Sequence, residues 1–329
     1  MAKVIRLHKI GGPENLQLDD VAVGQPGEGE VRLQVQAVGL NRAEAMYMRG
    51  FYFEQPQIPS RIGYEAAGIV KAVGAGVDSS WVGKRIATVP GYSMNRWGVL
   101  GEEAIVPADS LGEYPASLSP AEGSAIWMQY LTAYGALITV GNVHQGDFVL
   151  ITAASSSVGL AAIQIVKAEG AIPIAATRRS NKRDALLALG AAHVIATEEQ
   201  DLPAEVKRIA GGKGARVIFD PVAGPFLEKL AEATAPGGVV LVYGLLSQQP
   251  TPLPLIAVLR GGLTIRGYSL QELRRDVKLL ATAKQYVYDR LSDGRFHPKI
   301  AQTFPLERSV DAYQYLESNA QVGKVVITT

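Results

Sequence analysis

Apolar and polar positions divide the chain into regions with different periodicities. Residues 31–37 alternate between apolar and polar side chains, and this period of two predicts a half-buried strand. Short apolar runs at 66–74 and 83–89 follow, separated by glycine and proline as in β-rich folds. From about 121 to 266, short runs that are apolar throughout, such as VLIT and VVLV, alternate with helical patterns. Strands buried on both faces have this composition, so the sequence predicts an α/β fold with a doubly wound parallel sheet.

Length and composition agree with a globular protein of roughly two domains. The chain has 329 residues, of which 47% are hydrophobic and 19% are charged, so it can form sizeable cores. Its net charge of +1 argues against nucleic acid or an acidic membrane as a partner. Cationic residues interrupt the apolar run at the N-terminus, and polar or glycine residues interrupt the uncharged stretches 123–145 and 148–166. We therefore expect a soluble, cytoplasmic protein that does not interact with membranes.

Metal-binding residues are scarce. The chain has no cysteine and only four histidines, which lie far apart in the sequence and never at a ligand spacing such as i, i+4. Disulfides and thiolate-bound metals are therefore excluded, and we expect no metal site.

The clearest chemical signal lies between residues 147 and 182. The predicted strand DFVLIT runs into the turn AASSSVG and then into the helical pattern LAAIQIVKAEG, which is the order of a dinucleotide-binding βαβ unit. Aligned with G-x-G-x-x-G, the turn keeps one glycine and has small residues at the other two positions. The backbone of such a turn can approach a pyrophosphate, which the next helix faces with its N-terminus. We expect nucleotide binding here, with a purely structural turn as the alternative; the expected contacts are Ala154, Ser155, Ser156, Ser157, Val158 and Gly159.

The end of the next predicted strand indicates which nucleotide binds. NAD sites place an acidic residue about 20 positions after the glycines, where it accepts hydrogen bonds from the ribose 2′-hydroxyl. Here Thr177 occupies that region and is followed by Arg178, Arg179 and Lys182, with no carboxylate before Asp184. Cationic side chains pair with a 2′-phosphate, which a carboxylate would repel. The sequence therefore favours NADPH, with a solvated basic loop as the alternative.

Seven segments, in order, resemble the medium-chain dehydrogenase/reductases, in the zinc-independent branch that is similar to quinone oxidoreductases. They are GLNRAEAMYMRGFY (39–52), GYEAAGIVKAVGAGV (63–77), LTAYGALI (131–138), AASSSVG (153–159), ALGA (188–191), FDPVAG (219–224) and GKVVIT (323–328). The resemblance covers essentially the whole chain. It implies a β-rich, GroES-like catalytic domain built from residues 1–122 and 266–329 around a Rossmann-type NADPH-binding domain, 123–265, with a substrate cleft between the two.

The resemblance also assigns residues to the active site. Asn41 and Tyr52 lie where quinone reductases line the nicotinamide and substrate site, so Asn41 would hold the carboxamide and Tyr52 would donate to the acceptor oxygen. Tyr64 and Trp127 are candidates for the substrate pocket. Packing in the core is the alternative for Tyr52 and Trp127, and for Tyr64 the alternative is that it fills the position a metal ion occupies in zinc-dependent relatives. Further expected cofactor contacts are Thr132, Tyr243 and Gly244.

Differences from zinc-dependent relatives indicate which class of substrate the protein reduces. Those relatives have a cysteine near Asn41 and a histidine at the position of Tyr64, and neither is present here. Quinones and enones need a Lewis acid less than alcohols do, because hydride adds to a conjugated carbon and hydrogen bonds stabilise the resulting oxyanion. We therefore expect an enzyme that transfers hydride from NADPH to a quinone or an α,β-unsaturated carbonyl. The alternatives are metal-free carbonyl or alcohol oxidoreduction and a catalytically inactive NADPH-binding protein.

The segment 239–270 predicts a homodimer. It ends the nucleotide-binding sheet with a strand pattern at 263–265, preceded by the uncharged apolar stretch 253–259. An exposed sheet edge beside an apolar surface is a liability that a second copy can cover by two-fold symmetry. The resemblance implies the same assembly, and the alternative is a short helix at 253–259 packed on its own domain.

Overall fold

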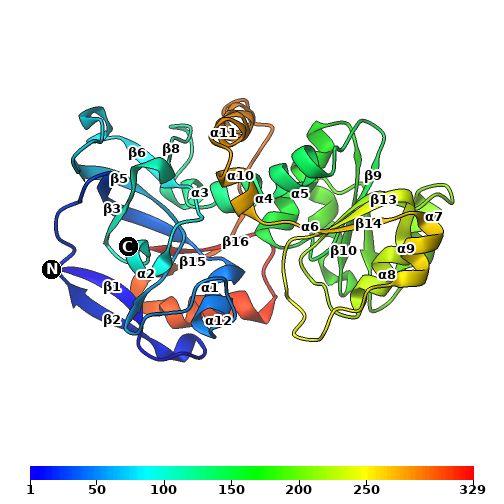
Figure 1. The fold of residues 1–329 in the computed structure, drawn as a ribbon, viewed down its shortest axis with the longest axis horizontal. Coiled ribbons are helices and arrows are strands. Elements are labelled where there is room, and N and C mark those ends of the chain that lie inside the picture. Colours follow the sequence, from blue (N-terminus) through cyan, green and yellow to red (C-terminus); the bar gives the residue numbers. More distant parts are fainter. The chain divides into compact units, whose positions relative to one another are not determined.

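The computed structural model describes all 329 residues, and the chain divides into two compact units (Figure 1). The first unit comprises Met1–Met128 and Tyr288–Thr329, and the second comprises Gln129–Val287. Helix α11 (Val277–Ser292) crosses the second division, and within the second unit the Tyr286 hydroxyl and the Glu169 carboxylate lie 2.6 Å apart. The expected domain boundaries at 122/123 and 265/266 remain predictions.

The first unit is built on two β-sheets. A three-stranded sheet has the order β2 (Leu16–Val21), β1 (Ala2–Leu7), β4 (Ser60–Arg61). The larger, seven-stranded sheet has the order β15 (Ile300–Pro305), β16 (Lys324–Thr328), β3 (Glu30–Gly39), β5 (Glu65–Val73), β6 (Arg85–Thr88), β8 (Leu111–Gly112), and β7 (Glu103–Pro107) also pairs with β3. Only β15 and β16 run parallel. The predicted strand at 31–37 is thus confirmed as the centre of a β-rich unit.

Strand register brings distant segments together at the end of β3. Gly39 lies opposite Glu65 of β5 on one side and opposite Val326 of β16 on the other. A Cβ at Gly39 would lie 1.9 Å from the Ser124 carbonyl oxygen, so only glycine allows this approach. The accompanying helices are α1 (Arg42–Met48), α2 (Met94–Trp97), α3 (Pro120–Gly123) and α12 (Ser309–Ser318).

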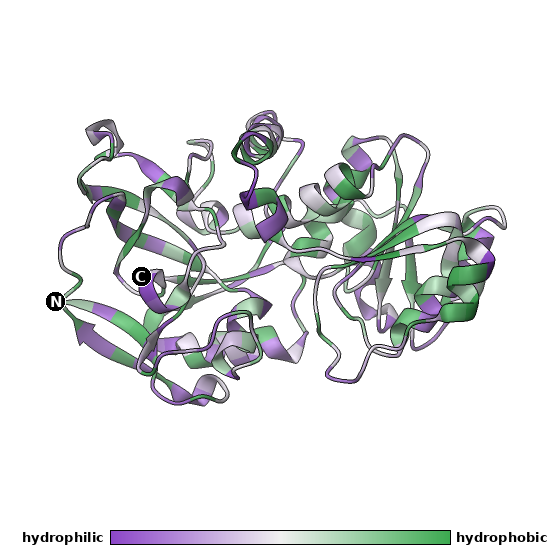
Figure 2. Ribbon diagram, in the orientation of Figure 1, coloured by the Kyte–Doolittle hydropathy of each residue, from purple (hydrophilic) through white to green (hydrophobic).

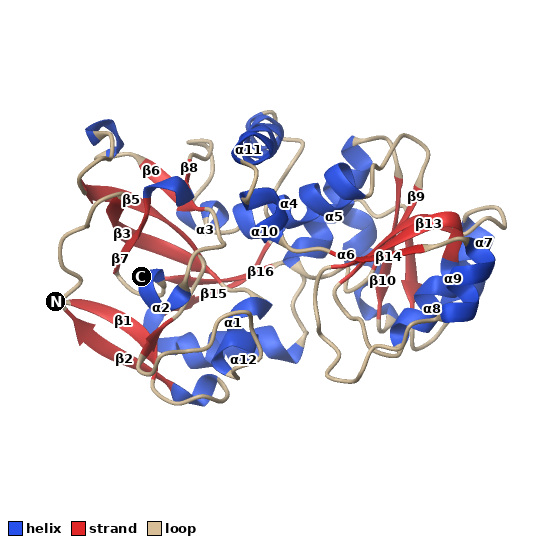
Figure 3. Cartoon of the chain, viewed as in Figure 1, coloured by secondary structure: helices blue, strands red, loops and turns tan.

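The second unit has a six-stranded parallel sheet. Its order is β11 (His193–Ala196), β10 (Ile172–Thr177), β9 (Phe148–Ile151), β12 (Ala215–Asp220), β13 (Thr234–Val242), β14 (Thr264–Gly267). This order is the Rossmann order 3-2-1-4-5-6, so the predicted doubly wound fold is confirmed. Helices flank the sheet on both sides (Figure 3). The helices of this unit are α5 (Ser157–Ala168), α6 (Arg183–Ala188), α7 (Leu202–Ile209), α8 (Phe226–Ala233), α9 (Leu255–Gly261) and α10 (Leu270–Arg274), together with most of α4 (Trp127–Tyr134) and of α11.

The long uncharged stretches are divided among several elements. Residues 123–145 contain the end of α3, the helix α4 and a π-helical segment at Gly135–Val140, and 148–166 contain β9, a turn and most of α5. No helix combines the length and the apolar character that crossing a membrane requires.

Candidate functional site

The turn between β9 and α5 has the geometry of a phosphate-binding turn. Ser156 is the N-cap of α5, and its Oγ accepts a hydrogen bond from the Gly159 N–H at 3.1 Å. Its backbone is extended (φ −69°, ψ 160°), so serine fits where the sequence pattern has glycine. Gly159 is required by packing, because a Cβ there would lie 2.7 Å from Ala154 Cα. The left-handed residue of the turn is Ala153 (φ 45°), which the sequence pattern did not single out.

The basic residues after β10 divide into two groups. Lys182 points to the turn between β9 and α5 and donates from Nζ to Ser155 Oγ at 3.0 Å. Partial burial and the nearby charge of Arg178 lower the pKa of Lys182. Arg179 instead forms an ion pair with Glu198 at 2.9 Å, and its side chain is 75% exposed. Thus Lys182 is joined to the turn, whereas Arg179 is already paired with an acid.

Other predicted cofactor residues lie at the carboxyl edge of the same sheet. Thr177 is the last residue of β10, and Tyr243 follows β13, where its N–H donates to the Asp220 carbonyl at 2.9 Å. The Tyr243 ring stacks on Phe219 with centroids 3.9 Å apart. Gly244 packs against Pro221, and a Cβ there would lie 2.9 Å from it. This edge is where open α/β sheets bind ligands. Thr132 lies in α4 and is 8% exposed.

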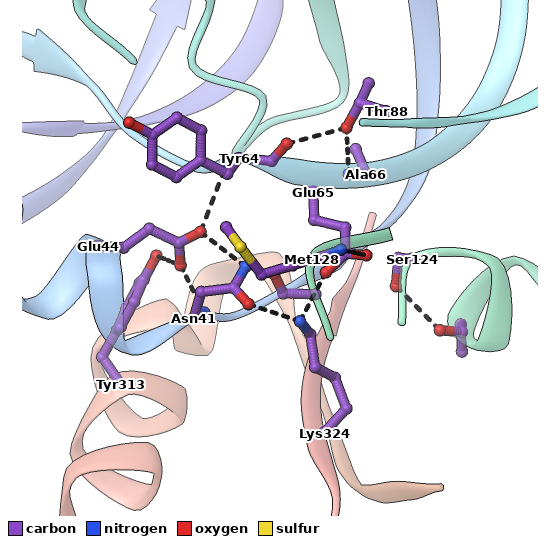
Figure 4. A network of polar contacts seen from close by, with 12 residues as sticks. Asn41, Glu44, Tyr64, Glu65, Ala66, Thr88, Ser124, Met128, Tyr313 and Lys324 are labelled. Carbon is purple, nitrogen blue, oxygen red and sulfur yellow. Dashed lines mark hydrogen bonds and ion pairs between the residues drawn. The ribbon is translucent and has the colours of Figure 1, made fainter. Parts of the chain in front are cut away.

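In the first unit, Asn41 belongs to a buried polar network (Figure 4). It is the N-cap of α1 and is 7% exposed. Its Oδ1 accepts from Lys324 Nζ at 2.7 Å, and its Nδ2 donates to the Gly39 carbonyl at 3.0 Å and to Glu44 Oε1 at 3.2 Å. Lys324 also binds Glu65 Oε2 at 2.6 Å, and these two side chains are 1% and 0% exposed.

Two carboxylates anchor this network to the surrounding elements. Glu44 accepts from the backbone N–H groups of Asn41 at 2.8 Å and Tyr64 at 3.1 Å, and from the Tyr313 hydroxyl at 3.0 Å. Burial raises the pKa of Glu44, against these hydrogen bonds and the Lys324 charge, which lower it. Glu65 Oε1 accepts from the Met128 N–H at 3.0 Å, in the first turn of α4.

Sequence reasoning missed most of this network. Glu44, Tyr313 and Lys324 were not among the predicted site residues, although Lys324 carried a signal: it is a charged residue at the start of the otherwise apolar strand pattern KVVIT. A lysine in such a strand needs a buried anion, because an unpaired buried charge is very unfavourable.

Tyr52 and Tyr64 lie in a cluster of aromatic rings. The Tyr52 ring centroid is 6.0 Å from that of Tyr64, which packs edge-on against Tyr92 at 5.6 Å. Tyr52 is half-buried and Tyr64 is 4% exposed. Burial raises the pKa of both hydroxyls, and the Tyr64 hydroxyl donates a hydrogen bond to that of Tyr52.

Two other aromatic residues are structural. Trp127, a predicted pocket residue, is 1% exposed and packs against Gly112, where a Cβ would lie 2.4 Å from the indole nitrogen. It therefore contributes to the core, which was the alternative interpretation, and its place in a substrate pocket remains a prediction. Tyr47 is fully buried and donates to Asn95 Oδ1 at 2.6 Å, and burial raises its pKa to about 12.

The side chains form no group of three or more His, Asp or Glu that could hold a metal ion. Tyr64 belongs to the aromatic cluster just described. The chemistry that these residues offer is hydrogen bonding to an oxygen atom of a substrate and, in the second unit, binding of phosphate groups.

Comparisons with known proteins agree with this arrangement. The family model of the alcohol dehydrogenase GroES-like domain matches residues 27–116, and the model described as zinc-binding dehydrogenase matches residues 157–284. A 2-haloacrylate reductase from a Burkholderia species is 30% identical, over 99% of this chain and 98% of the relative.

Two solved structures are similar over the whole chain. Escherichia coli quinone oxidoreductase, in complex with NADPH, has a TM-score of 0.92 at 30% identity and covers 100% of both chains. An NAD-dependent alcohol dehydrogenase has a TM-score of 0.89, also at 30% identity, and covers 99% of both chains. The names of the 2-haloacrylate reductase and the alcohol dehydrogenase describe different reactions.

Proposed function

Because the chain belongs to the medium-chain dehydrogenase/reductase superfamily, in its quinone-oxidoreductase-like branch, we propose that it reduces quinones or α,β-unsaturated carbonyls with NADPH. Its family makes the protein an oxidoreductase that uses a nicotinamide cofactor. The preference for NADPH over NADH is supported above all by the hydrogen bond between Lys182 and Ser155, which places a cation beside the turn between β9 and α5.

The donor set of the second unit fits a dinucleotide phosphate. The N–H groups of the first turn of a helix have no partner inside the helix, so those of Ser157 and Val158 in α5 suit a pyrophosphate. Lys182 and Arg178 would hold the 2′-phosphate, and Thr177, Tyr243 and Gly244 lie at the same sheet edge. Thr132 and Asn41 complete the proposed contacts.

Tyr52 has the central role in the proposed reaction. When bound, the cofactor supplies the hydride. As negative charge develops on the acceptor oxygen, the Tyr52 hydroxyl donates a hydrogen bond to it, and Tyr64 supports the Tyr52 ring from the side. The role needs a protonated hydroxyl, which tyrosine has at neutral pH, and burial raises the pKa of Tyr52 further.

A matched substrate panel tests the proposed function. We expect a para-quinone, 2-haloacrylate or a 2-alkenal to oxidise NADPH at least about tenfold faster than the saturated aldehyde of equal length, because only the conjugated acceptor delocalises the added charge. NADPH absorbance would be followed with each acceptor at equal concentration.

The same panel distinguishes the alternatives. Equal rates with the saturated aldehyde, or oxidation of an alcohol, would contradict the proposal in favour of metal-free carbonyl or alcohol chemistry, which the likeness to an alcohol dehydrogenase supports. Tight NADPH binding without turnover of any acceptor would instead indicate a catalytically inactive binding protein.

We also propose that the protein is a homodimer, formed through α9 and β14. Strand β14 pairs only with β13, so its outer edge is open. The predicted apolar stretch forms the helix α9, coloured hydrophobic in Figure 2. Its side chains Leu255, Ile256 and Leu259 are 54%, 67% and 72% exposed, and an open edge beside an apolar surface favours association.

A double substitution tests the dimer. We expect light scattering to give a mass of about 70 kDa, twice that of one 35.0 kDa chain. Ile256→Glu with Leu259→Glu should shift this mass to that of one chain, since charges in an apolar interface are unfavourable. The control is Val82→Glu, which changes an exposed residue of the first unit and should leave the mass unchanged. A single-chain mass for the unaltered protein would contradict the proposal.

A further inference from the structure

The buried lysine of the Asn41 network determines how Asn41 is oriented. Lysine is a pure donor, so the atom of the Asn41 side chain that faces Lys324 Nζ at 2.7 Å must be the oxygen. The Gly39 carbonyl, 3.0 Å from the other atom, is a pure acceptor and requires the nitrogen there. The two neighbours thus allow only one of the two amide orientations. In the other orientation, the amide NH₂ group would face the Lys324 ammonium group and the amide oxygen would face the Gly39 carbonyl oxygen.

Glu44 reinforces the same orientation. Its carboxylate receives four hydrogen bonds, from Asn41 N, Asn41 Nδ2, Tyr64 N and Tyr313 Oη. Four donors are about the capacity of an ionised carboxylate. Both protons of the Asn41 amide nitrogen are therefore engaged, by Gly39 and by Glu44, whereas Oδ1 accepts from Lys324 and, in the capping box of α1, faces the Glu44 N–H. Toward any ligand, Asn41 presents an acceptor and no donor.

Glu65 keeps Lys324 in place. The pair is completely buried, and three chain segments meet in it: the start of β5, the start of β16 and, through the Met128 N–H, the first turn of α4. Packing also confines the lysine stem, since a Cβ at Gly39 would lie 2.6 Å from Lys324 Cε. The ammonium group cannot move away from Asn41 without leaving its counterion in the core.

We propose that Lys324, held by Glu65, is a positioning residue that makes Asn41 an acceptor for the N–H group of the nicotinamide carboxamide. The inference rests on the proposed function, in which Asn41 contacts the carboxamide, and adds the direction of that contact. The protein then recognises the amide nitrogen of the cofactor through Asn41 and does not require its carbonyl oxygen there.

Cofactor analogues separate the two halves of the carboxamide. The 3-acetylpyridine analogue of NADP⁺ keeps the carbonyl oxygen but lacks the NH₂ group, whereas the thionicotinamide analogue keeps NH₂ and lacks the oxygen. By titration calorimetry, we expect the protein to bind the acetylpyridine analogue about tenfold more weakly than NADP⁺, as for one lost hydrogen bond, and the thionicotinamide analogue nearly as well as NADP⁺.

Paired substitutions test the role of Lys324. Lys324→Met alone leaves Glu65 as an unpaired buried charge, so the variant to use is Lys324→Met with Glu65→Gln, which removes both charges and keeps an acceptor for Met128. We expect this double variant to stay folded, with a lower melting temperature because Glu44 loses the nearby Lys324 charge, and to lose most of the tenfold preference for NADP⁺ over the acetylpyridine analogue, because the Asn41 amide is no longer held at its oxygen. Asn41→Ala should lose the same preference, and adding it to the double variant should change the ratio no further.

The control is Lys3→Met with Glu307→Gln, the same chemical change at an exposed ion pair, which should keep the preference. Retention of the tenfold ratio in the Lys324/Glu65 double variant would overturn the inference, as would an unaltered protein that binds both analogues equally. In either case NADP⁺ still binds, so the proposed function stands. Failure of the unaltered protein to bind NADP⁺ would overturn both.

Discussion

Replacing Lys182 with alanine is expected to weaken NADPH binding by roughly 10- to 150-fold, the equivalent of about 1.5–3 kcal/mol for a charge-assisted hydrogen bond to phosphate. NADH affinity should change little, because NADH lacks the 2′-phosphate. Arg178→Ala should act in the same direction, since Arg178 lies close enough to influence the Lys182 ammonium group. Fluorescence titration with both nucleotides measures the two affinities.

Arg179→Ala is the matched control for this prediction. Arg179 is paired with Glu198 and is 75% exposed, so its loss should change NADPH affinity by no more than about threefold. Melting temperatures would show that the loss of the hydrogen bond between Lys182 and Ser155 has not unfolded the turn. Equal affinities for NADPH and NADH in the unaltered protein would show that the cofactor assignment is wrong.

Tyr52→Phe is expected to lower kcat with a quinone or an enone by roughly 10- to 100-fold while NADPH affinity stays the same. The hydroxyl would stabilise charge that develops only in the transition state, so its removal affects the chemical step more than binding. Stopped-flow measurement of a single turnover at saturating NADPH isolates that step.

Tyr47→Phe provides the contrasting variant. The Tyr47 hydroxyl is buried and bonded to Asn95, so its loss should reduce the free energy of unfolding by about 1 kcal/mol and leave kcat unchanged. Normal single-turnover rates for Tyr52→Phe would mean that Tyr52 only packs against its aromatic neighbours.

Local sequence patterns predicted the elements of the second unit because the forces that form them act over short distances. The runs FVLI and VVLV are buried on both faces of a parallel sheet, and their composition alone indicates this. The turn after β9 and the start of α5 were likewise predictable, since Ser156 caps the helix three residues before Gly159. At 253–259 the sequence predicted an apolar surface, with a short helix packed on its own domain as the alternative; the structure shows a helix whose Leu255, Ile256 and Leu259 side chains are exposed.

Side-chain partners were decided by the tertiary structure. The sequence places Arg178, Arg179 and Lys182 in one cluster, but only the fold turns Lys182 to Ser155, 27 positions away, and Arg179 to Glu198 on the neighbouring loop. Lys324 and Asn41 are 283 positions apart and meet because β16 and β5 flank the end of β3 in a particular register. Periodicity along the chain determines which face of a strand is buried, whereas strand order and register determine which buried polar groups meet, and these depend on the packing of the whole unit.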